Sequence, residues 1–394
     1  MWNAQNKIFL TISNMFLLIA INASCSITHA GVPMPPLPEL FSLKLSYSCA
    51  DSTTEYCRTS ASPLIKNGII YARAFDEYVY SIDQMTGKIA GKYNTEQLSF
   101  STPTIQDGFL YASAWYLYAF DQNTTSLKWK KVWAINTTPT IYNGSLILGV
   151  RDGVVSVDRW TGNTKWEFKS TYPDDPYFSS PLIHNGHVFV GSYSPSQMGK
   201  TGFYSINAET GQVERVLRYG YDYYATPCAI NNTIYVGNKA NEFYAINQNT
   251  GAVQWSYTDK ESVLTQFITS PYCDVDKVYI SSSGSNDEAR FYAFDGKSGK
   301  IIWTFKPQRN GNITHSIEIK SSPTVKNDVV FFGCDNHYLY ALNKNTGELK
   351  WKFKADAEIR SKPTIDNGVV YFTTLSGTLY AIDEVTGLMH KDRK

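Results

Sequence analysis

Cysteine, histidine and acidic residues are the side chains best able to ligate a metal or act as nucleophiles, and their spacing here indicates no such site. The 394-residue chain has six cysteines, with no Cys-x-x-Cys motif and no adjacent pair. Neither a zinc site nor a thioredoxin-like motif is therefore supported. Of the six histidines, only His184 and His187 lie close together, three residues apart around a turn, which is not the spacing of a shared metal site. The acidic run 286–288 has no converging ligands, which is typical of a solvated turn rather than a calcium site. We predict no metal site and no catalytic residue.

A better candidate for chemistry is the residue three positions before each of eight regularly recurring prolines. These residues are Ser60, Phe100, Asn136, Phe178, Tyr224, Ile268, Lys320 and Arg360. If the repeats close into a ring, the eight positions meet near one mouth of the central channel. One arc of the mouth is then aromatic or apolar, and the neighbouring arc is basic. Aromatic residues and arginine are enriched at binding hot spots. We predict a binding surface made by Phe100, Asn136, Phe178, Tyr224, Lys320 and Arg360.

Two interpretations of this mouth remain open. In the first, the loop aromatics only pack on one another, and Lys320 and Arg360 pair with Glu318 or Glu358. In the second, an extended peptide lies across the aromatic arc, or a small carboxylate-rich ligand pairs with the two cations while stacking on an aromatic ring. The residues alone do not separate the peptide from the small ligand.

The elements that position these residues come from an internal repeat. A Ser/Thr-Pro pair recurs at Pro63, Pro103, Pro139, Pro181, Pro227, Pro271 and Pro323, and Lys362 takes the hydroxyl position before Pro363. A second motif, Tyr-Ala-Ile-Asp-x-x-Thr-Gly or a close variant, follows each proline. Four residues after its glycine position stands a tryptophan in five copies: Trp129, Trp166, Trp255, Trp303 and Trp351. Repeats of this length predict one supersecondary unit per copy.

Each copy reads as four short strands. Asn-Gly or Asp-Gly pairs such as Asn67-Gly68 and Asn367-Gly368 predict type I′ hairpins between the first and second strands. The Thr-Gly motif predicts the turn between the third and fourth. A single four-stranded sheet buries too little surface to stand alone, whereas sheets stacked around an axis cover both faces of each. We predict an all-β fold, an eight-bladed β-propeller of four-stranded antiparallel blades. The tryptophans would fill the gaps between blades.

Three segments make up the chain. Residues 1–30 carry Lys7, an apolar stretch and small residues before Gly31, which predicts a signal peptide. An uncleaved anchor and a lipid on Cys25 are the alternatives. Residues 31–60 hold Cys49 and Cys57, which could close a small loop, and the alternating stretch Leu40–Leu45, which could add a strand to the last blade. Residues 61–394 form the propeller. Its cysteines Cys228, Cys273 and Cys334 are expected to be small core residues.

The charge of the chain is nearly balanced. Lysine and arginine number 36, aspartate and glutamate 35, and the formal net charge is +1. This balance gives no reason to expect nucleic acid as a partner. Peripheral association with a membrane stays compatible with it.

The pattern Ser-Pro, Asn-Gly, Leu-Tyr-Ala-Ile-Asp-x-x-Thr-Gly-x-x-x-Trp resembles the quinoprotein-like propeller repeat of pyrroloquinoline-quinone (PQQ) alcohol dehydrogenases. The fullest copy runs from Ser322 to Trp351. In size and organisation the chain is similar to the propeller lipoproteins of the outer-membrane protein assembly machinery, which have no cofactor. The dehydrogenases are longer and bring adjacent cysteines and a calcium ion to the quinone, which this sequence does not match.

The resemblance implies a non-enzymatic binding scaffold of the periplasm or cell envelope, with envelope proteins or peptides as partners and no cofactor. One alternative is a compact PQQ-dependent alcohol or sugar oxidoreductase with calcium, in which Lys320 and Arg360 would bind the quinone carboxylates. The other is a structural or adhesive extracellular module, which predicts no ligand at the mouth.

Overall fold

The structure, a computed structural model, describes residues 41–45, 61–73, 76–99, 101–133, 137–170, 177–194, 201–218, 221–261, 265–284, 288–309 and 317–389. The chain divides into two units, Met1–Pro36 and Leu37–Lys394, and every described residue belongs to the second. The predicted signal peptide, Cys25, and the Cys49 and Cys57 pair lie outside the described residues and stay predictions. Within the described residues, no helix is long and apolar enough to cross a membrane.

The hairpin signals form the expected turns. Asn67 and Gly68 both have positive φ, 51° and 75°, which is the backbone of a type I′ turn. In the Thr-Gly turn, the Asp83 carboxylate accepts hydrogen bonds from the backbone N–H groups of Met85 and Thr86 at 3.1 and 2.8 Å. Gly87 then takes a φ of 66°. These side-chain-to-backbone bonds fix each connection locally, so the strand order follows from sequence-local chemistry.

The strands of the first four blades run in chain order from the centre outwards. Blade 1 contains β2 (Leu64–Lys66), β3 (Ile69–Arg73), β4 (Tyr78–Asp83) and β5 (Ile89–Asn94). Blade 2 contains β6 (Thr104–Gln106), β7 (Phe109–Ser113), β8 (Tyr116–Asp121) and β9 (Leu127–Val132). Blade 3 contains β10 (Thr140–Tyr142), β11 (Ser145–Val150), β12 (Gly153–Asp158) and β13 (Thr164–Lys169). Blade 4 contains β15 (Leu182–His184), β16 (His187–Tyr193), β17 (Phe203–Asn207) and β18 (Val213–Leu217), with β14 (Tyr177–Phe178) also paired to β16.

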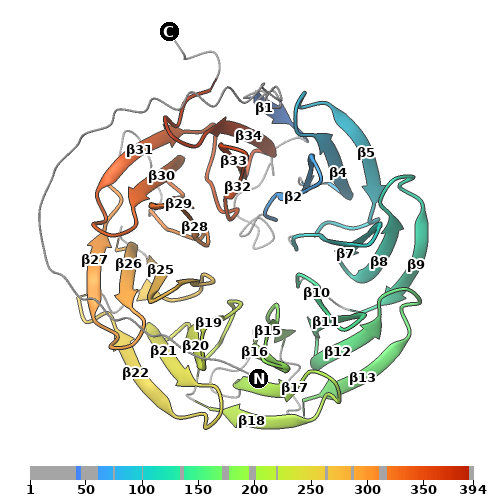
Figure 1. Cartoon of the computed structure of the whole chain (residues 1–394), viewed down its shortest axis with the longest axis horizontal. Coiled ribbons are helices and arrows are strands. Elements are labelled where there is room, and N and C mark those ends of the chain that lie inside the picture. The colour runs from blue at the N-terminus through green and yellow to red at the C-terminus, as the bar shows by residue number, and fades with distance from the viewer. Residues whose placement is uncertain are drawn as a thin grey trace, which may run out of the picture. The chain divides into compact units, whose positions relative to one another are not determined.

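The remaining blades repeat this order (Figure 1). Blade 5 contains β19 (Cys228–Ile230), β20 (Thr233–Gly237), β21 (Glu242–Asn247) and β22 (Val253–Thr258). Blade 6 contains β24 (Tyr272–Asp274), β25 (Lys277–Gly284), β26 (Arg290–Asp295) and β27 (Ile301–Phe305), with β23 (Thr265–Gln266) paired to β25. Blade 7 contains β28 (Thr324–Lys326), β29 (Val329–Gly333), β30 (Tyr338–Asn343) and β31 (Leu349–Lys354). Blade 8 contains β32 (Thr364–Asp366), β33 (Val369–Thr373) and β34 (Thr378–Asp383), with β1 (Phe41–Lys44) outermost. The predicted eight-bladed all-β propeller is confirmed.

Blade 8 takes its fourth strand from the other end of the propeller sequence. β1 pairs antiparallel with β34, and Phe41 lies opposite Ala381. This is the register at which Trp351 lies opposite Ala341 in blade 7. A Cβ on Gly87 of blade 1 would meet the Phe41 ring at 2.9 Å. Phe41 therefore fills the place that a fourth-strand tryptophan fills elsewhere, and the strand joins the two ends of the repeat array.

The tryptophans fill the seams between blades, as predicted. The indole of Trp351 donates to the Glu384 carbonyl of the next blade at 3.1 Å, and Trp166 donates to the Ala208 carbonyl at 3.0 Å. Each ring also covers the Thr-Gly glycine of that blade, where a Cβ would come within 2.5 to 2.6 Å of the indoles of Trp351 and Trp166. An added side chain at these glycines has no room, so the motif glycine and the tryptophan are one packing unit.

A belt of hydroxyl groups explains the Ser/Thr-Pro pairs. The Ser62 N–H donates to the Thr102 hydroxyl at 3.1 Å, and the Thr102 N–H donates to the Thr138 hydroxyl at 3.2 Å. The same bond closes the ring, where the Lys362 N–H donates to the Ser62 hydroxyl at 3.0 Å. At each of these seams, a hydroxyl group of one blade satisfies a backbone donor of the blade before it.

Two cysteines expected as separate core residues instead form a disulfide. Cys228 on β19 and Cys273 on β24 are bonded, with their Cα atoms 5.8 Å apart. They lie in different repeats, so proximity in sequence gave no indication of the pairing. Cys334 is a free, buried cysteine, as expected.

Candidate functional site

The predicted mouth is the face that carries the connections from each fourth strand to the next blade, together with the turns between second and third strands. Of the six residues predicted to bind there, Phe178, Tyr224, Lys320 and Arg360 are described. Phe100 and Asn136 lie outside the described residues and stay predictions. The structure places the four described residues in three different environments.

The two cations of the basic arc are already paired. Arg360 donates to both carboxylate oxygens of Asp335 at 2.9 and 2.8 Å. Lys320 lies 3.0 Å from the Glu318 carboxylate and 3.8 Å from Asp335. Asp335 is 1% exposed, so its charge is held almost entirely by these cations. The sequence-based alternative of internal pairing is therefore confirmed for Lys320 and Glu318, and Asp335 is the partner that it did not foresee.

Glu318 shows how strongly this arc is neutralised. Burial acts to raise the pKa of its carboxyl, but the hydrogen bond from the Ser283 hydroxyl at 2.5 Å and the Lys320 charge outweigh burial and lower the pKa. The carboxylate therefore stays ionised beside Lys320. Two acids now face two cations, and the arc presents no excess positive charge to a ligand.

Phe178 belongs to the packing between blades and not to an open mouth. It is 1% exposed, and its ring lies 5.2 Å from that of Tyr204 and 5.9 Å from that of Phe168. The backbone of β14 pairs with β16, which turns Phe178 inward and leaves its neighbour Tyr177 partly exposed. Because side chains alternate along a strand, only one of these two aromatic residues can face the core.

Tyr224 is part of a stack of three partly exposed tyrosines, which we call the tyrosine ledge: Tyr177, Tyr193 and Tyr224. The rings of Tyr193 and Tyr224 are 4.4 Å apart at 28°, and those of Tyr177 and Tyr193 are 5.5 Å apart at 18°. The ledge spans the connection into blade 4, the end of β16 and the connection into blade 5. Offset stacking of this kind holds the rings in a fixed relation.

A buried carboxylate supports one end of the ledge. Asp222, 3% exposed, accepts hydrogen bonds from the Ser194 N–H at 3.1 Å and the Tyr224 hydroxyl at 3.3 Å. The Lys239 ammonium lies 4.0 Å from this carboxylate and 5.8 Å from the centre of the Tyr224 ring. Burial raises the pKa of Tyr193 to about 12, so the central ring of the ledge is uncharged at neutral pH. The result is a rigid aromatic surface with a cation at its edge.

Sequence reasoning missed Tyr193, the central ring of the ledge. The residues expected at the mouth were those of the connections before the prolines, whereas Tyr193 is the last residue of a second strand. β16 runs over 7 residues, while β20 and β29 run over 5. The extra length carries Tyr193 to the mouth, and the aromatic alternation of Phe189 and Tyr193 was the signal available for it.

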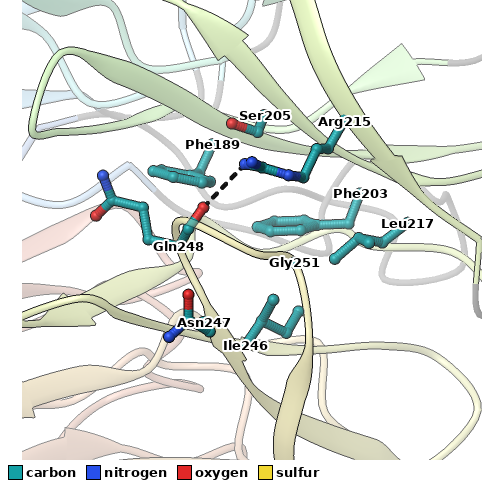
Figure 2. A pocket seen from close by; sticks show the side chains of 9 residues that line it. All are labelled: Phe189, Phe203, Ser205, Arg215, Leu217, Ile246, Asn247, Gln248 and Gly251. Carbon is teal, nitrogen blue, oxygen red and sulfur yellow. Dashed lines mark hydrogen bonds between the residues drawn. The ribbon is translucent and has the colours of Figure 1, made fainter.

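A small cavity elsewhere in the molecule is a packing feature rather than a second candidate site (Figure 2). Arg215 stands at the tryptophan register of blade 4, opposite Ser205. Its guanidinium donates to the Gln248 carbonyl at 3.2 Å, the bond that an indole makes at other seams. Because the arginine side chain is thinner than an indole, a gap remains beside it, lined by Phe189, Phe203, Leu217 and Ile246.

A quinone cofactor with calcium would need cations to bind its carboxylates and side-chain ligands to hold the metal ion. Lys320 and Arg360, the two cations available for quinone carboxylates, are bound to Glu318 and Asp335. In the described part of the chain, no group of three or more His, Cys, Asp or Glu side chains is arranged to hold a metal ion. The described residues do not fit that cofactor, and we derive no chemistry through it.

Comparison with known proteins gives the family. The sequence profile of the family described as outer membrane protein assembly factor BamB matches residues 58–257 and 287–389. The chain belongs to the BamB family. The resemblance to quinoprotein-like propellers, and to the outer-membrane assembly propeller in particular, is thereby confirmed.

Members and relatives of the BamB family differ in what they are named for. The outer membrane protein assembly factor BamB of Yersinia pestis is 31% identical over 230 residues, which cover 54% of this chain and 55% of that protein. The tetrathionate hydrolase of Acidithiobacillus ferrooxidans is 23% identical over 322 residues, which cover 78% of this chain and 60% of that protein. The chain thus spans less than two thirds of the length of either relative.

Solved structures agree on the BamB-like fold. BamB from Moraxella catarrhalis superposes with a TM-score of 0.65 at 16% identity, covering 88% of this chain and 99% of that one. A quinohemoprotein alcohol dehydrogenase from Comamonas testosteroni gives 0.68 at 15% identity, covering 89% and 77%. At these identities the likeness establishes the propeller and does not distinguish a scaffold from an enzyme.

Proposed function

We propose that this chain is a non-enzymatic binding scaffold of the cell envelope that holds an extended polypeptide on the tyrosine ledge. The proposal places it in the periplasm or on the membrane face, with envelope proteins as partners in outer-membrane protein assembly or a similar process. No cofactor is expected. Family membership supports the general role, and the site itself supports the choice of a polypeptide ligand.

The observation that carries the proposal is the ledge. Three stacked rings of Tyr177, Tyr193 and Tyr224, partly exposed and fixed by Asp222, offer a preformed aromatic surface with Lys239 at its edge. Rigid tyrosines supply contact area at a low entropic cost, and preorganisation increases affinity. An extended strand places alternate side chains on one face, a spacing that suits a row of stacked rings.

The first test measures binding of a fluorescent peptide with the sequence of an outer-membrane β-strand. Tyr193→Ala removes the central ring, and the proposal expects an affinity loss of about tenfold or more, because central aromatic anchors contribute most to an interface. Tyr193→Phe keeps the stack and should bind like the wild type. Tyr338→Ala, at another partly exposed tyrosine, is the matched control. Equal affinities for Tyr193→Ala and Tyr338→Ala would remove the ledge from the proposal.

The alternative, a compact PQQ-dependent oxidoreductase, is kept because alcohol dehydrogenases with a quinone are also similar to this chain. Titration of the protein with PQQ and calcium, followed by thermal unfolding and absorbance, separates the two. A ligand that binds the folded state raises the unfolding midpoint by mass action. A saturable rise would favour the enzyme, and no rise together with peptide binding would favour the scaffold. A structural or adhesive module predicts neither response.

A further inference from the structure

The seam between blades 1 and 2 holds an arginine where every other seam holds a small residue. Arg73 ends β3 and lies opposite Val79 of β4. The residues at the same register in the other blades are Ser113, Gly149, Gly191, Gly237, Ser281, Gly333 and Thr373. At Gly149 a Cβ would come within 2.2 Å of the Ser179 carbonyl oxygen. A long side chain at this register therefore needs room that the seam at Gly149 does not have.

Among the described residues, the Arg73 guanidinium has no counter-ion. Arg73 is 4% exposed, and all three guanidinium nitrogens are buried without a hydrogen-bond partner among the residues that the structure describes. The hydroxyl of Tyr118, a side chain that is 0% exposed, is likewise buried without a partner. Tyr118 packs in the same seam as Val79, the residue that lies opposite Arg73. The Arg73 guanidinium and the Tyr118 hydroxyl are thus two buried donors in one seam, and neither has a hydrogen-bond partner among the described residues.

The nearby carboxylates are engaged elsewhere. Asp76 accepts from the Tyr78 N–H at 3.0 Å and from the Tyr80 hydroxyl at 2.5 Å. Tyr80 packs in the seam between blades 8 and 1, so Asp76 bonds to a side chain of the other seam, and its charge acts on Arg73 without a hydrogen bond between them. Glu96 pairs with Lys130 at 2.6 Å. Within the described residues, no carboxylate lies at ion-pair distance from Arg73.

A buried guanidinium without an anion is strongly unfavourable, and a carboxylate is the group that matches its fork geometry. The Tyr118 hydroxyl could donate to the same carboxylate. Towards the surface, the Tyr116 ring lies 6.0 Å from that of Tyr118, with the Lys130 ammonium 4.2 Å above it. Val132, 76% exposed, stands opposite Tyr116 on β9. The surface beside Tyr118 is therefore apolar at Tyr116 and Val132, and it carries the Lys130 cation, which is paired with Glu96.

We propose that the seam between blades 1 and 2 binds a carboxylate of a polypeptide partner, an acidic side chain with an apolar neighbour, through Arg73 and Tyr118. Arg73 supplies the paired donors, and Tyr118 supplies a third. The apolar neighbour packs at Tyr116 and Val132. This site lies on blades 1 and 2, whereas the tyrosine ledge lies on blades 4 and 5, so either can fail without the other.

The test uses the full chain and two capped dipeptides, N-acetyl-Glu-Leu-amide and N-acetyl-Gln-Leu-amide, at millimolar concentration. The Glu peptide should raise the unfolding midpoint by about 1–2 °C, and the Gln peptide should not. Tyr118→Phe should fold like the wild type and show a smaller response to the Glu peptide. Equal responses to the two peptides would overturn the proposal. So would an equal rise with inorganic phosphate, which would indicate a general anion site.

Stability without ligand separates a binding role from a structural one. Arg73→Met should lose the response to the Glu peptide while its unfolding midpoint stays equal to that of the wild type or rises, since an uncompensated buried charge is removed. Arg360→Met is the matched control, because it leaves Asp335 buried without its partner and should lower the midpoint. If Arg73→Met loses as much stability as Arg360→Met, Arg73 is a structural residue and the proposal fails.

Discussion

At the scale of single residues, the fold depends on side chains that bond to the backbone of their own turn. In the turns between third and fourth strands, Asp83, Asp158 and Asp295 accept hydrogen bonds from N–H groups two or three residues ahead. Asn207 and Asn247 do the same with an amide oxygen. The two residue types make the same turn, but only aspartate changes its charge with pH.

This difference predicts acid sensitivity. Hydrogen bonds from the turn lower the pKa of Asp83, Asp121, Asp158 and Asp295, in the case of Asp121 to about 2. A carboxyl whose pKa is lower in the folded than in the unfolded state stabilises the fold above its unfolded pKa, near 4, and loses that stabilisation as the pH falls towards the folded value. We therefore expect stability to decline between about pH 4 and pH 2.

The test replaces all four aspartates by asparagine, which repeats 4, 5 and 7 already carry at Asn207, Asn247 and Asn343. The unfolding midpoint of the variant should fall less than that of the wild type between pH 5 and pH 2.5, while the two proteins should be similar at pH 7. Parallel curves for the two proteins would assign the acid sensitivity to other carboxyls.

At the scale of elements, the outer strand of each blade carries one residue at the tryptophan register, which packs against the next blade. Gly91, Arg215 and Phe41 stand at this register where the tryptophan is missing. In blade 1 that residue is Gly91, and its neighbour Tyr93 donates to the Gln122 carbonyl that an indole would otherwise reach. Thr125 takes the place of the motif glycine and lies against Gly91, where a Cβ would meet its methyl at 2.9 Å. A smaller residue on one blade is thus offset by a larger one on the next.

Arg215→Trp should stabilise the seam between blades 4 and 5. An indole at this register would fill the gap beside Phe203 and Ile246 and keep the bond to the Gln248 carbonyl. Filling such a cavity typically adds about 1–2 kcal/mol to the free energy of unfolding. Chemical denaturation of the variant measures it. Arg215→Met, which is apolar but not large, is the control, and a gain in both variants would point to charge removal instead.

Phe41→Ala should weaken the closing strand. The Phe41 ring is partly buried over Gly87, so we expect a loss of about 2 kcal/mol, less than for a fully buried phenylalanine. Phe41→Trp restores the residue found at this register in other blades and should be at least as stable as the wild type. If Phe41→Ala unfolds like the wild type, β1 contributes pairing but no seam contact.

At the scale of the whole molecule, the propeller must resist opening, because every blade relies on two neighbours for its core. Three features act against opening: β1 bonded to β34, the hydroxyl belt from Ser62 to Lys362, and the disulfide between β19 and β24. The disulfide ties the inner strands of blades 5 and 6, next to the seam in which Arg215 stands at the tryptophan register. A bond of this kind is compatible with the oxidising envelope that the proposed function requires.

Removing the disulfide should lower stability. Cys228 and Cys273 are separated by 45 residues, and closing a loop of that length stabilises the folded state by about 4 kcal/mol in the chain-entropy description. The double variant Cys228→Ser, Cys273→Ser should unfold at a lower temperature than the wild type, and reductant should lower the midpoint of the wild type but not that of the variant. A wild-type midpoint insensitive to reductant, in a protein shown by mass spectrometry to be reduced, would contradict this expectation.

The repeat, the turn types, the all-β class, the eight blades and the role of the tryptophans could all be predicted from the sequence alone. These features depend on contacts within one repeat or between identical neighbours, so spacing such as that from Gly347 to Trp351 is sufficient to predict them. The sequence also identified Tyr224 as a mouth residue, because its position before a proline is fixed by the repeat.

The neighbours of the predicted mouth residues became clear only from the tertiary structure. Phe178 turns inward because β14 pairs with β16, and Arg360 is neutralised by Asp335 from the preceding blade. Cys228 and Cys273 are joined, Tyr193 reaches the mouth on a long strand, and Arg73 is left without an anion in the described residues. These facts depend on the length and pairing of individual strands or on contacts between unlike side chains of different repeats, and repeat spacing carries no information about either.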